Sequence, residues 1–186
     1  NTRGHDMVAS HNSDRFIGNA YDIFDECKLD LDASIGLLGE HGYSRICLLG
    51  VSIGAVKVAY YQALVQDPRV AAVIAFGPVR FSHSYFLSSQ DGTEHQRNYE
   101  QAKSLVEAGR PDALMQVNFP NDHALFSAEV YIDRHGPAEK YNLLPIINDI
   151  QCPLLILAGT LENLTRHNDF AQDLFNAVTS NPDVAL

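Results

Sequence analysis

Hydrophobic residues occur along this chain in two alternating patterns. Over residues 30–42 and again over residues 55–65 they recur at the spacing that puts them on one face of a helix. Continuous apolar runs over residues 45–49 and 70–76, bounded by glycine or proline, are typical of strands inside a parallel sheet. The order of these segments predicts helix, strand, helix and strand.

The pattern changes over residues 80–149, where apolar runs disappear, aromatic and polar residues mix, and short helices are the best local description. A buried-strand pattern returns over residues 153–159, and an amphipathic helix follows it. Because parallel strands need crossover connections, we predict an α/β fold with a mostly parallel sheet and helices on both faces. We expect residues 1–79 and 150–186 to form its core, with the segment between them as a mainly helical insertion.

The composition of the 186 residues is that of an ordinary globular domain, with 46% hydrophobic and 19% charged residues. The net charge of −10 disfavours nucleic acid and anionic membrane surfaces as partners, since both attract clusters of Lys and Arg. No apolar stretch reaches the ~18 residues that cross a bilayer. The three cysteines have no metal-ligand spacing, so we expect a cytoplasmic protein without cofactor or metal, and the oligomeric state stays open.

One short motif lies where a strand meets a helix. The string Gly50-Val51-Ser52-Ile53-Gly54 follows an apolar run and precedes a helical pattern, which is the context of a nucleophile elbow. We expect Ser52 on a sharp, strained turn with its hydroxyl exposed, and both glycines to let the strand and the helix approach closely. The Ile53 amide would then donate to a developing oxyanion. The alternative is an ordinary glycine turn.

The motif and the order of the elements resemble the α/β-hydrolase superfamily over nearly the whole chain. Residues 2–6 (Thr-Arg-Gly-His-Asp) resemble the loop that follows the fourth strand in many members, and residues 45–54 resemble the fifth strand with its elbow. Residues 70–76 and 154–158 then correspond to the sixth and seventh strands, and residues 80–149 to the inserted cap. The resemblance implies a serine hydrolase whose first strands would precede Asn1.

The resemblance also implies where the acid of a catalytic triad belongs. In the superfamily this carboxylate follows the seventh strand, and Glu162 in Gly159-Thr160-Leu161-Glu162-Asn163 has that position. Aspartate is more usual there, and Asp169 on the next helix is a competing candidate. A solvated loop carboxylate is the plain alternative for Glu162.

The general base is not found at its expected place. The triad order is serine, acid, histidine, with the histidine one helix and one strand beyond the acid. His167 comes only five residues after Glu162, so it is poorly placed to reach Ser52. The second oxyanion donor would come from a loop upstream of Asn1. We therefore expect residues 1–186, taken alone, to be catalytically inert.

Aromatic residues of the inserted segment are candidates for lining an apolar pocket over the elbow, since ligand pockets are concave and mostly apolar. About half of them are expected to form the core of the insertion instead, because aromatic side chains dominate core energetics. The candidates are Phe81, Tyr85, Phe86, Phe119, Phe126 and Tyr131.

Three functions are compatible with these features. The first is hydrolysis of a carboxylic ester or related acyl bond of a small molecule, in which Ser52 attacks the carbonyl and Glu162 orients a downstream histidine. The same catalytic groups are also compatible with cleavage of thioesters, peptides or carbon–carbon bonds. The second is a hydrolase-like protein without catalysis that binds a ligand or a partner, since a fold does not determine a function. The third is acyl transfer to an acceptor other than water.

Overall fold

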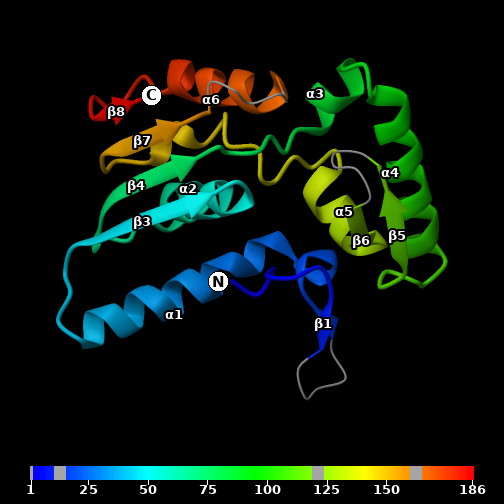
Figure 1. Cartoon of the computed structure of the whole chain (residues 1–186), viewed down its shortest axis with the longest axis horizontal. Coiled ribbons are helices and arrows are strands. Elements are labelled where there is room, and N and C mark those ends of the chain that lie inside the picture. Colours follow the sequence, from blue (N-terminus) through cyan, green and yellow to red (C-terminus); the bar gives the residue numbers. More distant parts are fainter. Residues whose placement is uncertain (1, 11–15, 119–123, 160–164) are drawn as a thin grey trace. The chain divides into compact units, whose positions relative to one another are not determined.

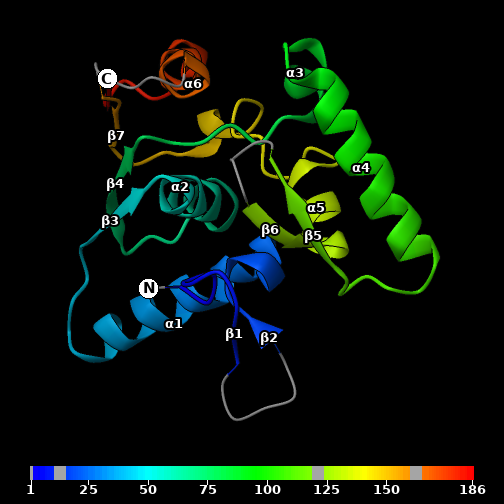
Figure 2. The same cartoon turned by 45° about the vertical axis from the view of Figure 1, so that its right-hand side comes forward.

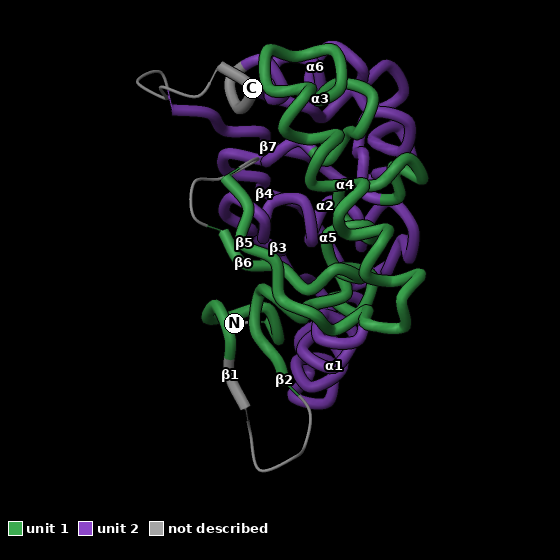
Figure 3. Tube along the Cα trace, turned by 90° about the vertical axis from the view of Figure 1, so that its right-hand side faces the viewer, with its two compact units in different colours: residues 1–27, 81–140 green, residues 28–80, 141–186 purple. Residues whose placement is uncertain are grey.

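The computed structural model describes residues 2–10, 16–118, 124–159 and 165–186 (Figures 1 and 2). Contacts divide the chain into two compact units, which are described separately (Figure 3). The sheet unit comprises residues 28–80 and 141–186. The mixed unit comprises residues 1–27 and 81–140.

The sheet unit is built on four parallel strands in the order β3-β4-β7-β8. Its strands and helices agree with the predicted ones, except that β8 was not predicted, and the predicted α/β class is confirmed. The elements are α1 (Cys27–Glu40), β3 (Ile46–Val51), α2 (Ile53–Val65), β4 (Val70–Phe76), a 3-10 helix (Ile147–Asp149), β7 (Leu154–Leu157), α6 (Thr165–Ala177) and β8 (Val184–Ala185).

Helix α2 is the most deeply buried element of this unit. Every residue from Ala55 to Ala63 is buried, because the helix is apolar on nearly all sides and a helix of that kind needs neighbours all around. The Tyr61 hydroxyl donates to Asp32 of α1 at 2.6 Å. The Tyr60 ring meets Tyr141 edge-on, with centroids 5.3 Å apart. The helix that follows the elbow is thus held on several sides.

The two faces of the sheet differ in burial. Along β3, Ile46 and Leu48 are buried, whereas Leu49 and Val51 are 61% and 54% exposed. Side chains alternate between faces along a strand, so these residues mark one covered and one open face. Helices α2 and α6 lie on the same side of the strands (Figure 2). The sequence predicts helices on both faces, and the described residues supply these two on one face.

The mixed unit contains two short antiparallel strand pairs besides its helices. The sequence predicts only short helices in its inserted part, so the pair β5–β6 is a finding of the structure. The elements are β1 (Ala9–Ser10), β2 (Phe16–Ile17), two 3-10 helices (Asn19–Tyr21 and Phe24–Glu26), α3 (His83–Ser88), α4 (Gly92–Glu107), β5 (Leu114–Val117), β6 (Ala124–Ser127) and α5 (Ala128–His135).

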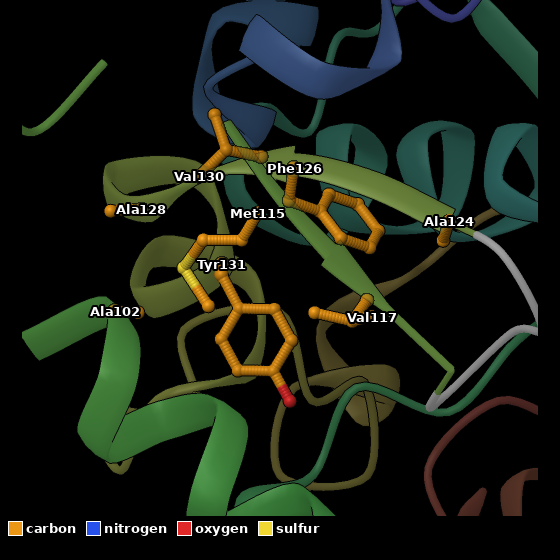
Figure 4. Packing of buried hydrophobic residues seen from close by; sticks show 8 residues of the cluster. All are labelled: Ala102, Met115, Val117, Ala124, Phe126, Ala128, Val130 and Tyr131. Atoms are coloured by element: carbon orange, nitrogen blue, oxygen red, sulfur yellow. The ribbon is translucent and has the colours of Figure 1, made fainter. Parts of the chain in front are cut away.

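The core of the mixed unit lies between α4, α5 and the β5–β6 pair (Figure 4). Met115 and Val117 alternate with exposed residues along β5, and Met115 is paired with Phe126 of β6. Phe126 meets the fully buried Tyr131 of α5 edge-on, with ring centroids 6.0 Å apart. The strands therefore pack one side against the helices and leave the other more open.

A buried ion pair ties the N-terminal segment to α5. The Arg134 side chain donates to the Asp22 carboxylate at 3.0 Å and to the Asn19 side chain at 2.6 Å. The side chains of Arg134 and Asp22 are each 1% exposed. The Phe24 amide also donates to Asp133 of α5 at 3.2 Å. Such contacts group residues 1–27 with residues 81–140, whereas the sequence places the N-terminal segment with the sheet.

Histidines lie inside the mixed unit. His95 is fully buried, with Nε2 2.8 Å from Nδ1 of His83 and Nδ1 3.2 Å from the Tyr131 hydroxyl. The His83 Nδ1 also lies 3.0 Å from the carbonyl oxygen of His135, which can only accept. His83 therefore donates there, and His95 faces it with an acceptor nitrogen. Burial, and secondarily the neighbouring His83, lowers the pKa of His95 to about 4.

We predict that removal of Arg134 is far more costly than removal of an exposed arginine. Arg134→Ala leaves the Asp22 carboxylate buried without its cation, and the free energy of unfolding should fall by about 3–5 kcal/mol. The matched control is Arg97→Ala on α4, whose side chain is 70% exposed and pairs with Glu94; this change should cost less than about 1 kcal/mol. Urea denaturation measures both, and equal losses would contradict the burial argument.

A second prediction concerns the stability of the protein at low pH. The pKa of His95 is about 4 in the folded protein and 6.5 in an unstructured chain, so the unfolded state binds more protons between these values. Stability should therefore decrease as the pH falls from 6.5 towards 4, by up to roughly 1.4 kcal/mol per pH unit. His95→Gln should flatten this dependence, whereas His41→Gln, at an exposed position, should retain it. Urea midpoints at pH 7 and pH 5 test this, and an unchanged dependence in His95→Gln would refute it.

Candidate active site

Ser52 lies on the turn between β3 and α2, as the sequence predicts. Val51 ends the strand and Ile53 begins the helix. Ser52 has φ 55° and ψ −120°, a backbone conformation that non-glycine residues rarely adopt and that costs of order 1–3 kcal/mol. The residue is exposed. Such strain persists only where the surrounding structure enforces it.

The Ser52 hydroxyl does not cap the helix that it precedes. Ser82 and Ser127 precede α3 and α5 with extended backbones, and their hydroxyls accept from the amides of Tyr85 and Val130, as capping serines normally do. Ser52 makes no side-chain cap hydrogen bond. The ordinary structural reason for a serine at this position is therefore absent, and the hydroxyl is left for other contacts.

Backbone hydrogen bonds join the turn to the ends of the neighbouring strands. The Ser52 amide donates to the carbonyl of Phe76, the last residue of β4, at 2.8 Å. The Gly77 amide donates to the carbonyl of Leu157, the last residue of β7, at 2.7 Å. The carboxyl ends of β3, β4 and β7 are thus joined side by side. Open α/β sheets bind ligands at this edge.

Only one of the two motif glycines is required by close packing. A Cβ on Gly50 would lie 2.0 Å from the carbonyl oxygen of Gly54 and 2.6 Å from the amide nitrogen of Ala55, which is far inside contact distance. A Cβ on Gly54 would meet no neighbouring atom of the described chain within 4 Å. The prediction of close approach is confirmed for Gly50, whereas Gly54 lies on a helix side that is open at this point.

The first turn of α2 supplies the amide that the sequence predicts for an oxyanion. Ile53 is the first residue of the helix, and amides of the first turn have no acceptor within their own helix. The helix dipole adds positive potential at this end. Ile53 is half-exposed and follows Ser52 directly, so its amide is suited to donate to an oxygen bound beside the serine. This role of Ile53 stays a prediction.

The predicted acid, Glu162, lies outside the described residues. It belongs to the connection between β7, which ends at Leu157, and α6, which begins at Thr165. The competing Asp169 lies on α6 and is exposed. The assignment of the acid to Glu162 therefore stays a prediction.

Histidines are distributed over both units. In the sheet unit His41 is the histidine whose side chain the structure describes; it follows α1, and its Nδ1 lies 2.9 Å from the carbonyl of Leu37. His41 precedes β3, whereas Ser52 follows it, so the length of the strand separates them. The side chain of His167 is outside the described part. His5 of the mixed unit is exposed and pairs with Asp6.

Four of the six predicted pocket aromatics are interior residues of the mixed unit. Phe81, Phe86, Phe126 and Tyr131 are at most 4% exposed. They contribute to the core, which is the alternative that the sequence left open for half of the set. Tyr85 is half-buried, and Phe119 lies outside the described residues. The placement of the inserted segment over Ser52 stays a prediction.

The described residues were compared with the requirements of a metal site and of a membrane-spanning helix. No group of three or more His, Cys, Asp or Glu side chains that could hold a metal occurs among its described residues. None of the helices that the structure describes combines the length and apolar character needed to span a membrane.

The fold is that of known α/β-hydrolase structures. An alpha/beta hydrolase, GrgF from Penicillium sp. sh18, superimposes with a TM-score of 0.66 at 16% identity, over 91% of this chain and 65% of that one. A monoacylglycerol lipase from Paleococcus ferrophilus gives 0.60 at 18% identity, over 87% of this chain and 63% of that one. An alpha/beta fold family hydrolase from Bacillus anthracis str. Sterne gives a TM-score of 0.52 at 14% identity, over 91% of this chain and 68% of that one.

Comparison of the amino-acid sequence with known families and proteins gave no match. No family model matches the chain, and no curated protein matches it. The chain has the α/β-hydrolase fold, and it spans less than two thirds of the lengths of GrgF and the monoacylglycerol lipase.

We predict opposite effects for alanine at the two motif glycines. Gly50→Ala forces β3 away from α2 and should lower the free energy of unfolding by more than about 4 kcal/mol, since the clash is with backbone. Gly54→Ala meets open space in a helix and should raise it by about 0.4–1 kcal/mol. Thermal and urea unfolding of the two variants measure the difference. A tolerated alanine at Gly50 would contradict the close approach.

Proposed function

We propose that the protein is a serine hydrolase that cleaves a carboxylic ester or a related acyl bond of a small molecule, with Ser52 as the nucleophile. The observation that carries the proposal is the combination of strain, exposure and absence of capping at this one serine. A serine held at this cost without a structural role is best explained by chemistry. The α/β-hydrolase fold supports the reaction class.

The chemistry that we propose begins with attack of the Ser52 hydroxyl oxygen on the carbonyl carbon of the substrate. The proton passes to a general base, and the Ile53 amide donates to the oxyanion that forms. Collapse of this intermediate releases the alcohol and leaves an acyl-serine, which water then hydrolyses. The positive end of α2 supports the negative charge without any movement of the helix.

The base and the acid belong to the proposal as well. A serine hydroxyl needs a base near it, and an imidazole needs a carboxylate that keeps its tautomer. We assign the carboxylate to Glu162 from its place after β7, where the carboxyl ends of the neighbouring strands carry Ser52 and Gly77. In α/β-hydrolases the triad residues follow one another as serine, acid and histidine, so the histidine comes later in the chain than the acid.

Labelling of the full-length protein with a fluorophosphonate probe tests the proposal directly. The probe should modify Ser52, as mapped by peptide mass spectrometry, because only an activated serine reacts quickly. Ser52→Ala should abolish labelling and lower kcat for a short-chain p-nitrophenyl ester by at least about 10⁴-fold. Its stability should stay within about 0.5 kcal/mol of the parent, because Ser52 caps no helix.

The matched control is Ser127→Ala. Ser127 is also a serine that precedes a helix, but its hydroxyl accepts from the Val130 amide at 3.3 Å. This variant should lose about 1 kcal/mol of stability and keep the labelling. Absence of labelling at Ser52 in the folded full-length protein would refute the hydrolase and favour a hydrolase-like binding protein without catalysis.

A further inference from the structure

The short helix α3 is held in the mixed unit in part by the side chain of its first residue. The Nδ1 atom of His83 lies 3.0 Å from the carbonyl oxygen of His135 in α5 and 2.8 Å from Nε2 of His95 in α4. The His83 ring also meets the rings of His95 and Tyr99, with centroids 4.8 and 5.3 Å apart. One nitrogen atom of α3 thus joins it to both α4 and α5.

Helix α3 is also held by an aromatic side chain and by a carboxylate. Phe86 is 1% exposed, and its ring meets those of His95 and His135. The Glu139 carboxylate accepts from the Ser84 amide in the first turn of α3 at 2.6 Å. Departure of α3 would therefore open to water the side of His95 that faces this helix.

The positions of the ring protons follow from what each neighbouring atom can do. A carbonyl oxygen only accepts, so the neutral His83 ring carries its proton on Nδ1. His95 then faces this proton with a lone pair on Nε2. As a neutral ring it carries its own proton on Nδ1, which lies 3.2 Å from the Tyr131 hydroxyl. The arrangement is therefore specific for a neutral His95.

A second proton on His95 is incompatible with this arrangement. Its Nε2 would carry a hydrogen and face the Nδ1 hydrogen of His83 across 2.8 Å. Movement of the His83 proton to its own Nε2 would restore that contact, but the Nδ1 lone pair would then face the His135 carbonyl oxygen. Either way α3 loses one of its two contacts at this nitrogen. An added proton on Nε2 of His83 alone disturbs neither contact.

The titratable groups around His95 favour its neutral form. Burial, and secondarily His83 of α3, lowers the pKa of His95 to about 4. From α5, Tyr131 supplies no charge, because burial raises the pKa of its hydroxyl, and His135 would add a like charge if protonated. On α4 itself, Glu94 is engaged in an ion pair within its own helix. A proton on His95 is thus costly while α3 stays in place.

We propose that α3 is an acid-sensitive latch, which Nδ1 of His83 holds closed while His95 is neutral and which a proton on His95 loosens. The proposal is independent of the proposed hydrolysis. Once α3 departs and water reaches the ring, the pKa of His95 returns towards 6.5, so the open form binds more protons below that pH. The opening equilibrium should therefore shift towards the open form by about 20-fold between pH 7 and pH 5.

Hydrogen exchange of the amides of α3 tests the latch in the full-length protein. Their protection factors, corrected for the direct effect of pH on exchange, should fall by about 20-fold from pH 7 to pH 5. His95→Gln should reduce this change to less than about twofold, because the amide oxygen of the new side chain accepts from His83 at either pH. His83→Ala should leave α3 weakly protected at both pH values.

The matched control is Glu139→Gln. Glu139 also contacts the first turn of α3, so its protonation is the alternative source of an acid effect. The fall of about 20-fold should persist in this variant, because the proton that loosens the latch is bound by His95. Loss of the pH effect in Glu139→Gln, together with its persistence in His95→Gln, would overturn the proposal.

NMR of the ring nitrogens tests the geometry without any variant. At pH 7 both His83 and His95 should carry their proton on Nδ1, as the contacts with the His135 carbonyl and the Tyr131 hydroxyl require. A His95 ring with its proton on Nε2 at pH 7 would overturn the proposal even if the variants failed to fold.

Urea separates opening of the latch from unfolding of the mixed unit. Exchange through departure of α3 exposes little surface, so it should depend only weakly on urea, whereas exchange of α4 amides through unfolding should depend on it steeply. The same urea dependence for α3 and α4 would show that α3 opens only when the unit unfolds, and the latch would have to be abandoned.

Discussion

The close approach of β3 and α2 is the constraint on which the rest of the sheet unit depends. A six-residue strand and a thirteen-residue helix meet across one residue, and the approach leaves no room for a side chain at Gly50. Ser52 adopts its positive φ because the chain must reverse within that space. The hydrogen bond to Phe76 and the burial of α2 on all sides stabilise the turn. Packing of the whole unit thus stabilises a strained serine.

The sheet unit was predictable because its information is local. The runs over residues 45–49 and 70–76 form β3 and β4 nearly as predicted, since a buried parallel strand is encoded by a continuous run of apolar residues. The two-residue β8 and the four-residue β5 and β6 are too short for a periodic pattern to separate them from loops. Their pairing is decided by neighbours far away in the sequence.

Long-range polar contacts were the other part that the sequence concealed. The Arg134–Asp22 pair joins residues 112 positions apart, and nothing in the sequence near either residue indicates its partner. His95 and His135 are both buried among aromatic rings, and no motif around either residue in the sequence indicates this. The turn at Ser52 was predictable for the opposite reason: strand, motif and helix are adjacent in the sequence, so the context that gives the motif its meaning is local.

Arginine–aspartate pairs near the two ends of β4 differ in how far apart in the sequence their partners lie. At its start, Arg69 donates to both oxygens of Asp67, two residues away, and these hydrogen bonds lower the pKa of the Asp67 carboxyl. That side-chain pair closes a local turn, and Asp67 also accepts from the Tyr61 hydroxyl of α2 at 3.4 Å. At its end, Arg80 reaches a helix 93 residues later in the sequence, at the edge of the sheet that carries Ser52. An ion pair between segments that are distant in the sequence constrains their relative geometry, whereas a pair within one turn constrains only that turn.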